Sequence, residues 1–131
     1  MLRALVALIG VAAVAATIDL AYKAGADGAW LHERSRTYAV VVAGVSVLWA
    51  GAILLTRSVP MAAAGGLLLG GAVGNLVSLA IWGGVPDPIV VAPIAFNLAD
   101  LFAFAGFGLV CVASLGLASS HRLDEPVRIR R

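Results

Sequence analysis

The sequence predicts an all-α polytopic membrane protein, a single domain over residues 1–131 with four transmembrane helices. Hydrophobic residues make up 62% of the 131 residues and charged residues only 12%, and the mean hydropathy is +1.03. A soluble domain is closer to half apolar and a quarter charged, so this short chain cannot bury its apolar surface in its own core and requires lipid. The net charge of +2 gives no indication of nucleic-acid binding.

Four runs of the sequence approach the length of about 20 apolar residues that a membrane-spanning helix needs. We expect helices at about residues 2–22, 38–55, 61–82 and 92–118. We expect the polar parts to be a connection at 23–37, tight turns at 56–60 and 83–88, and a tail at 119–131. The first run also resembles a secretory signal peptide, but it is long for the apolar part of one, and we interpret it as a retained helix.

The placement of lysine and arginine predicts the orientation, because cytoplasmic segments are enriched in these residues. With both termini in the cytoplasm, six of them lie on the cytoplasmic side and three on the outer side. The six are Arg3, Arg57, Arg122, Arg128, Arg130 and Arg131, and the three are Lys23, Arg34 and Arg36. We therefore expect both the N-terminus and the C-terminus to be cytoplasmic, with the basic tail near the anionic inner leaflet.

Polar residues occur at a similar depth in three of the four predicted helices. Asp19 lies near the outer end of the first helix, Asn75 and Ser78 lie near the outer end of the third, and Asp100 follows the outer start of the fourth. Polar side chains at membrane depth usually face the interior of a bundle. We therefore expect one shared polar cavity, with Asn97 beside Asp100 because residues three apart share a helix face.

A repeat of small residues crosses the same region. Gly66, Gly70 and Gly74 occur at four-residue spacing, and Ser78 continues the repeat. Small residues every four positions allow helix backbones to approach closely in lipid. The repeat predicts a packing face, and the first interpretation of Ser78 is as its last member.

The other polar residues also have structural interpretations. Asn75 and Asn97 are expected to form hydrogen bonds across helices, and Asp19 to pair with Lys23 or to accept a hydrogen bond from a neighbouring backbone. Lys23 itself is expected at the membrane interface. His32 is expected in an exposed loop without a second ligand at metal-binding spacing, so no metal site is predicted.

Several motifs of the chain resemble those of signal peptidase II, the bacterial lipoprotein signal peptidase family, over nearly the whole length. Asp19-Leu20-Ala21-Tyr22-Lys23 looks like the Asp-x-x-x-Lys motif of that family, and Gly70-Gly71-Ala72-Val73-Gly74-Asn75 looks like its Gly-Gly-Ala-x-Gly-Asn. Val85-Pro86-Asp87 is similar to its Val-x-Asp, and Phe96-Asn97-Leu98-Ala99-Asp100 matches its Phe-Asn-x-Ala-Asp. The order of the motifs and the four-helix topology agree with the family.

The resemblance implies an intramembrane aspartyl protease of the bacterial plasma (inner) membrane that removes signal peptides from lipid-modified prolipoproteins. Such an enzyme uses two carboxylates that share a proton, and close like charges favour the sharing. Asp100 matches one member of this catalytic dyad. The other member usually follows Gly-Asn by three residues as Asp-Arg, and the same two positions here are Ser78 and Leu79. A serine hydroxyl cannot replace the missing carboxylate.

Two further departures lie on the outer side. Residues 24–37 are shorter than the corresponding family segment and lack its asparagine-containing motif, and prolines at positions 86 and 88 flank Asp87. Asp87 or Asp19 could in principle replace the lost carboxylate, but neither has the required spacing. Ser78 as a nucleophile would need a base and an oxyanion hole.

Three functions therefore remain open. The leading hypothesis is a non-catalytic protein similar to signal peptidase II that acts as an accessory or scaffold subunit of a larger membrane complex. The alternatives are an aspartyl endopeptidase acting on prolipoproteins and a protein that binds lipid or lipopeptide. The expected partners are membrane lipids and other membrane-protein subunits, with a lipoprotein signal peptide only if the chain is active; no cofactor is expected.

Overall fold

Four long helices account for most of the chain. The structure, a computed structural model, describes the backbone of residues 1–123 and the side chains of residues 1–119. The helices are α1 (Leu2–Ala24), α2 (Arg36–Leu55), α3 (Val59–Trp82) and α4 (Leu98–Leu123). All four are long and apolar enough to cross a membrane. The polytopic all-α fold expected from the sequence is therefore confirmed.

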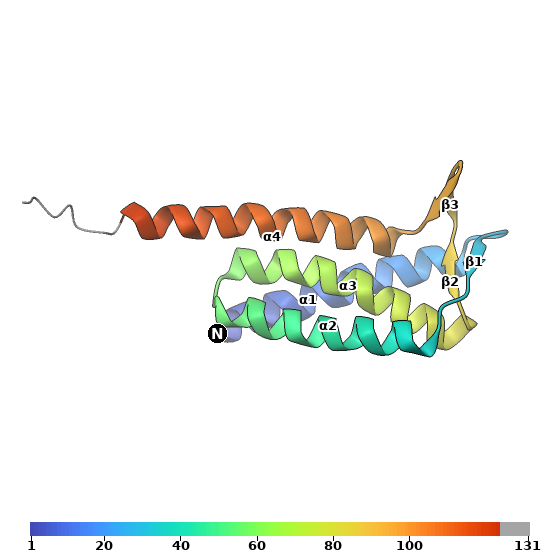
Figure 1. Ribbon diagram of the computed structural model, residues 1–131, viewed down its shortest axis with the longest axis horizontal. Coiled ribbons are helices and arrows are strands. Elements are labelled where there is room, and N and C mark those ends of the chain that lie inside the picture. The colour runs from blue at the N-terminus through green and yellow to red at the C-terminus, as the bar shows by residue number, and fades with distance from the viewer. Residues whose placement is uncertain (124–131) are drawn as a thin grey trace, which may run out of the picture.

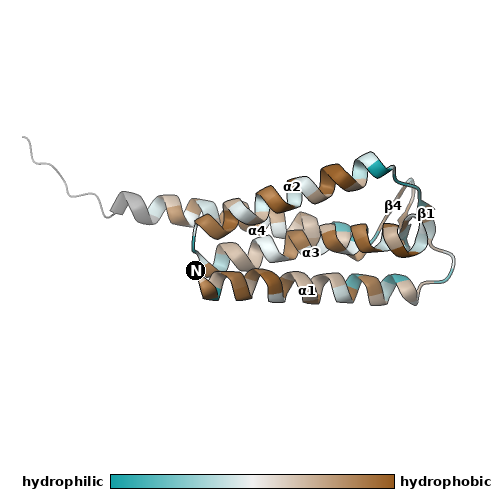
Figure 2. Ribbon diagram, turned by 90° about the horizontal axis from the view of Figure 1, so that it is seen from below, coloured by the Kyte–Doolittle hydropathy of each residue, from teal (hydrophilic) through white to brown (hydrophobic). Residues whose placement is uncertain are grey.

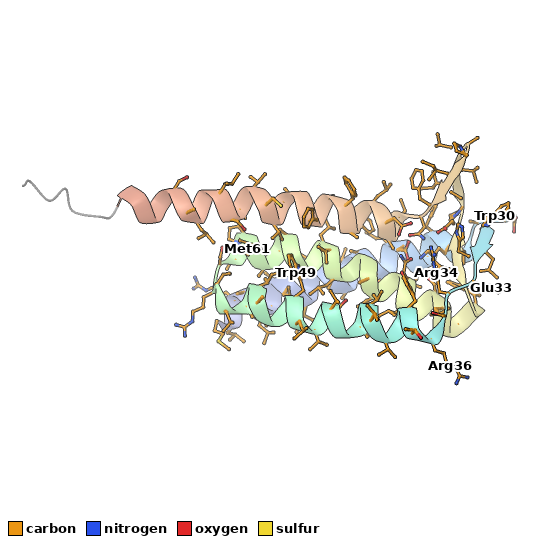
Figure 3. All side chains as sticks on the ribbon, in the orientation of Figure 1. Trp30, Glu33, Arg34, Arg36, Trp49 and Met61 are labelled. Atoms are coloured by element: carbon orange, nitrogen blue, oxygen red, sulfur yellow. The ribbon has the colours of Figure 1, made fainter. Side chains whose placement is uncertain are left out.

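Successive helices run in opposite directions, so the bundle has two distinct ends (Figure 1). The N-terminus and the C-terminal part of α4 lie at one end, and all the strands lie at the other, which we call the strand end. Glu33, Arg34 and Arg36 gather at the strand end beside Trp30 (Figure 3). Hydrophobic residues predominate along the helices, as Figure 2 shows, whereas hydrophilic residues concentrate near the helix ends.

Side-chain hydrogen bonds determine where two of the helices begin. Ser35 accepts a hydrogen bond from Tyr38 N at 3.1 Å at the start of α2, and Ser58 accepts one from Met61 N at 3.3 Å at the start of α3. Both serines satisfy a backbone N–H that has no partner within the helix. The helix α3 ends at Gly83, whose φ of +73° is the left-handed conformation that glycine adopts without a steric penalty.

The helix α3 lies at the centre of the bundle and packs against each of the other three helices. Its glycine face contacts α1 at very short range. A Cβ atom at Gly66 would lie 2.6 Å from Leu8 O, and one at Gly70 would lie 2.6 Å from Ala15 Cβ. The predicted packing face therefore exists, but α1 of the same chain occupies it, and it is not available to a partner helix.

The helix α2 is the most peripheral of the four. Ile53 is its only buried residue, and it packs against Gly65 of α3. The remaining core lies mainly between α1, α3 and α4. It contains the buried side chains of Leu8, Met61, Leu69 and Val110.

The strand end contains four short strands that the sequence analysis did not predict. β1 (Trp30–His32) pairs antiparallel with β2 (Val85–Asp87), and β3 (Ile89–Val91) pairs antiparallel with β4 (Ile94–Phe96). The register places Trp30 opposite Asp87, and Ile89 opposite Phe96.

The boundaries expected for two segments were therefore wrong. Residues 92–97 belong to the β3–β4 hairpin and its exit, so the fourth helix begins at Leu98 and not near residue 92. The β-branched residues of 89–94 favour strands, but a short apolar run does not distinguish a strand from a helix. Residues 85–87 form a strand and not a simple turn, and α4 extends into the expected tail; residues 124–131 lie outside the described part of the chain.

Candidate functional site

The side chain of Lys23 lies at the centre of a buried polar cluster. Its Nζ atom lies 2.7 Å from Asp19 Oδ2, and it donates hydrogen bonds to Asn75 Oδ1 at 2.7 Å and to Ser78 Oγ at 3.1 Å. Lys23 is only 4% exposed. Lys23 lies in the last turn of α1, which continues to Ala24, and its side chain faces α3.

Asp19 connects this cluster to the start of α4. Its Oδ1 atom accepts a hydrogen bond from Ala99 N at 2.8 Å, while Oδ2 faces Lys23. Both interpretations of Asp19, as the ion-pair partner of Lys23 and as an acceptor for a neighbouring backbone, are therefore confirmed. Gly74 makes this arrangement possible, because a Cβ atom there would lie 2.6 Å from Asp19 Oδ2.

Asn97 and Asp100 form a reciprocal cap at the start of α4. Asp100 N donates to Asn97 Oδ1 at 3.1 Å, and Asn97 N donates to Asp100 Oδ2 at 3.2 Å. This is the capping-box arrangement, in which two residues three apart satisfy each other's free backbone N–H groups. The other carboxylate oxygen of Asp100 accepts a hydrogen bond from Asn75 Nδ2 at 3.1 Å. Asp100 is exposed, so it forms the open edge of the cluster.

Asp87 extends the cluster into the strand end. Its side chain is only 4% exposed, and its two oxygens interact with Asn97 Nδ2 and with His32 Nδ1. The expectation for His32 was therefore incomplete: the residue belongs to β1, is 36% exposed at its side chain, and contacts a buried carboxylate. The β1–β2 pairing causes this contact, because it brings these two segments together.

Ser78 is the residue at which the resemblance to signal peptidase II implies a second catalytic aspartate. The residue is completely buried, and its Oγ atom donates to Gly74 O at 2.7 Å while it accepts from Lys23. Lys23 donates hydrogen bonds to Asn75 and Ser78 and forms an ion pair with Asp19. A lysine held as a donor in this way cannot act as the base that a serine nucleophile requires.

No second carboxylate contacts Asp100 among the described side chains. The hydrogen-bond partners of Asp100 are Asn75 and Asn97. Asp19 is completely buried and faces Lys23 and Ala99, and Asp87 faces Asn97 and His32. Neither aspartate is placed to share a proton with Asp100 in this conformation. Over residues 1–119, no three His, Cys, Asp or Glu side chains are grouped so that they could hold a metal ion.

Two apolar cavities lie along the membrane-spanning part of the bundle, between α1, α3 and α4. One has a volume of about 230 Å³ and the other about 490 Å³, and Val11 and Leu67 line both. Phe102 lines the smaller cavity, and Leu109 lines the larger one. Neither cavity is lined by a residue of the polar cluster.

Together these features define a class of protein: a multi-pass helical membrane protein with a buried, charged polar cluster that ends at one exposed aspartate. The family model described as signal peptidase (SPase) II matches residues 4–116 of the chain. The chain therefore belongs to the signal peptidase II family.

A solved structure supports the same fold. It is described as a bacterial membrane enzyme, and it resembles this chain with a TM-score of 0.65 over 94% of both chains, at 17% sequence identity. No curated protein matches the chain. The family assignment therefore rests on the family model, and the solved structure shows that the fold is shared.

Most of the polar cluster was expected from the sequence, but not all of its contacts. Asp19, Asn75, Ser78, Asn97 and Asp100 were expected to converge, and the hydrogen bonds described above connect all five. Lys23 was expected only as the ion-pair partner of Asp19, without its contacts with Asn75 and Ser78, and His32 was placed outside the cluster. The four-residue spacing of Asp19 and Lys23 was a signal for the first, since such residues share a helix face, but no local pattern predicts the contact of His32 with Asp87.

Proposed function

We propose that this chain is a non-catalytic member of the signal peptidase II family that resides in the bacterial plasma membrane as an accessory subunit of a larger membrane complex. The observation that carries the proposal is the environment of position 78. A serine stands there, it is completely buried, and both of its hydrogen bonds are made to Lys23 and Gly74. Proton sharing between two carboxylates requires a second carboxylate near Asp100, and none of the described aspartates takes that place.

The other aspartates support the same proposal. Asp19 compensates the buried charge of Lys23, and removing a partner from a buried ion pair is strongly unfavourable. Asp87 holds Asn97 and His32 at the strand end. Moving either carboxylate toward Asp100 would leave buried groups without partners, which costs more than an ordinary change of side-chain conformation.

The experiment that tests the non-catalytic part is cleavage of a diacylglyceryl-modified prolipoprotein by the purified protein in lipid. We expect no cleavage by the unchanged protein or by Asp100→Asn. A Ser78→Asp, Leu79→Arg double variant restores the family's pair at these positions and is expected to gain activity. Cleavage by the unchanged protein that disappears in Asp100→Asn would overturn the proposal and favour the usual role of the family, an aspartyl endopeptidase.

The accessory role is supported by the exposure of α2. Because α1 fills the glycine face of α3, a partner helix would have to dock elsewhere, and α2 contributes only Ile53 to the buried core. Leu48 of α2 is 76% exposed and Leu115 of α4 is 70% exposed, so the two leucines form a matched pair for mutation.

The test of the accessory role is isolation of the protein in native lipid particles, followed by identification of stoichiometric partners. We expect Leu48→Trp to lower the recovery of the partner and Leu115→Trp to leave it unchanged. Isolation of the protein without any stoichiometric subunit would contradict the accessory role. Bound acyl chains in the absence of a partner would instead favour lipid or lipopeptide binding, for which the apolar cavities between α1, α3 and α4 offer space.

A further inference from the structure

A continuous series of side-chain contacts leads from the surface of the strand end to the exposed aspartate. His32 contacts Asp87, Asp87 contacts Asn97, and Asn97 exchanges two hydrogen bonds with Asp100. The two interior members are almost completely excluded from solvent: Asn97 is 0% exposed and Asp87 is 3% exposed. The imidazole of His32 is 36% exposed, so water reaches the series at both His32 and Asp100.

Among the described residues, Asp87 is the charged side chain that contacts the His32 ring, and Trp30 is its aromatic neighbour. Asp87 is the charged group that faces it from β2. The β3–β4 hairpin, which lines a cavity of about 250 Å³ together with Trp30 and His32, contributes only uncharged residues there. On its own segment, Glu33 and Arg34 follow His32 and are exposed, and Arg34 stacks on the ring of Tyr38 at 5.3 Å.

We propose that His32 is a positioning residue for Asp100, and that the charge of the imidazole controls how firmly the Asn97–Asp100 cap is held. Histidine is the side chain whose charge changes within the physiological pH range. A charged imidazole forms an ion pair with the buried Asp87 carboxylate, and a neutral one offers at most a single weaker hydrogen bond. The inference concerns the orientation of Asp100 and does not depend on whether the chain cleaves a substrate.

The burial of Asp87 couples the charge of His32 to the Asn97–Asp100 cap. A buried carboxylate must be compensated by its partners, and Asp87 has two, Asn97 and His32. When the imidazole loses its charge, the carboxylate is less well compensated and draws more solvent into the strand end. Asn97 contacts Asp87 and caps α4 at the same time. Its hydrogen bonds with Asp100 therefore weaken when the environment of the Asp87 carboxylate changes.

The experiment is hydrogen exchange of the Asp100 backbone amide, measured by NMR on the full-length protein in lipid nanodiscs between pH 5 and pH 8 and corrected for the intrinsic exchange rate. This amide reports directly on the cap, because it donates to Asn97 Oδ1. We expect its protection to fall by about threefold or more as the pH rises through the range in which histidine loses its charge. The side-chain amide resonances of Asn97 are expected to shift with the same midpoint as the His32 ring.

Three variants make the outcome decisive. His32→Gln keeps a polar side chain without a titratable charge and is expected to abolish the pH dependence at Asp100, as is Asp87→Asn. His121→Gln is the matched control, because it removes the other histidine of the chain, and it is expected to keep the dependence. The inference is overturned if the unchanged protein shows no pH dependence at Asp100, or if the dependence persists in His32→Gln. Unaltered thermal stability of His32→Gln at pH 8 would separate positioning from a general folding defect.

Discussion

Lys23 and Asp19 form an ion pair in which neither side chain is exposed, with Lys23 Nζ 2.7 Å from Asp19 Oδ2 one helical turn away. A buried pair is stable only when further hydrogen bonds compensate for lost hydration. Here Asn75 and Ser78 accept from the lysine, and Ala99 N donates to the aspartate. The pair thereby connects α1 to α3 and to the first turn of α4, the element that carries Asp100.

Replacement of Lys23 tests this connection. We expect Lys23→Met to lower the free energy of unfolding by about 3–5 kcal/mol, because Asp19 is left as an uncompensated buried charge. The measurement is reversible unfolding in detergent micelles followed by circular dichroism. The double variant Asp19→Asn, Lys23→Met removes both charges and is expected to lose less stability than the sum of the two single variants. Strictly additive losses would show that the two side chains do not interact.

The close approach of α1 and α3 predicts a strong effect of a small substitution. We expect Gly70→Ala to destabilise the protein by about 1–3 kcal/mol, because the added methyl group would overlap Ala15 and the backbone of Ala12. Gly44 of α2 is the matched control, since no atom lies within 4 Å of a Cβ placed there. Gly44→Ala is expected to leave the melting temperature unchanged or to raise it. Equal effects of the two substitutions would exclude close packing at Gly70.

Replacement of Asn97 separates its two roles. We expect Asn97→Ala to cost about 0.5–2 kcal/mol through loss of the cap, and more because Asp87 loses one partner. Asn97→Ser keeps a capping hydroxyl, but its shorter side chain does not reach Asp87. Hydrogen exchange of Asp100 and Leu101 is therefore expected to be fast in Asn97→Ala and intermediate in Asn97→Ser. Identical exchange in the two variants would show that the capping hydroxyl contributes nothing to the protection of these amides.

The burial of Ser78 predicts that it is not a nucleophile. We expect labelling of the protein by a fluorophosphonate probe to be at background, and equal in the unchanged protein and in Ser78→Ala. Ser78→Ala is also expected to cost only about 1 kcal/mol, because Lys23 keeps its ion pair with Asp19 and its hydrogen bond to Asn75. Probe labelling that is lost in Ser78→Ala would contradict this prediction.

Local sequence patterns were sufficient for the helices and for part of the cluster. Hydropathy identified all four spans, and the three-residue spacing of Asn97 and Asp100 placed the two side chains beside each other, although the helix was expected to begin near residue 92. The same patterns did not identify the strands, because runs such as 89–96 are too short for periodicity to distinguish strand from helix. They also did not predict that Lys23 is buried against α3, since whether a lysine near a helix end reaches outward or inward depends on the acceptors that other helices supply.

The sequence by itself determined that the chain is a four-helix membrane protein of this family and that a serine stands where a catalytic aspartate is expected. Those properties depend on composition, helix length and local motifs, which are set by neighbouring residues. Only the tertiary structure decided that the glycine face is filled by α1, that Lys23 holds Ser78, and that His32 reaches Asp87. Each of these is a contact between segments far apart in the chain, and such contacts depend on how the helices and strands pack against one another.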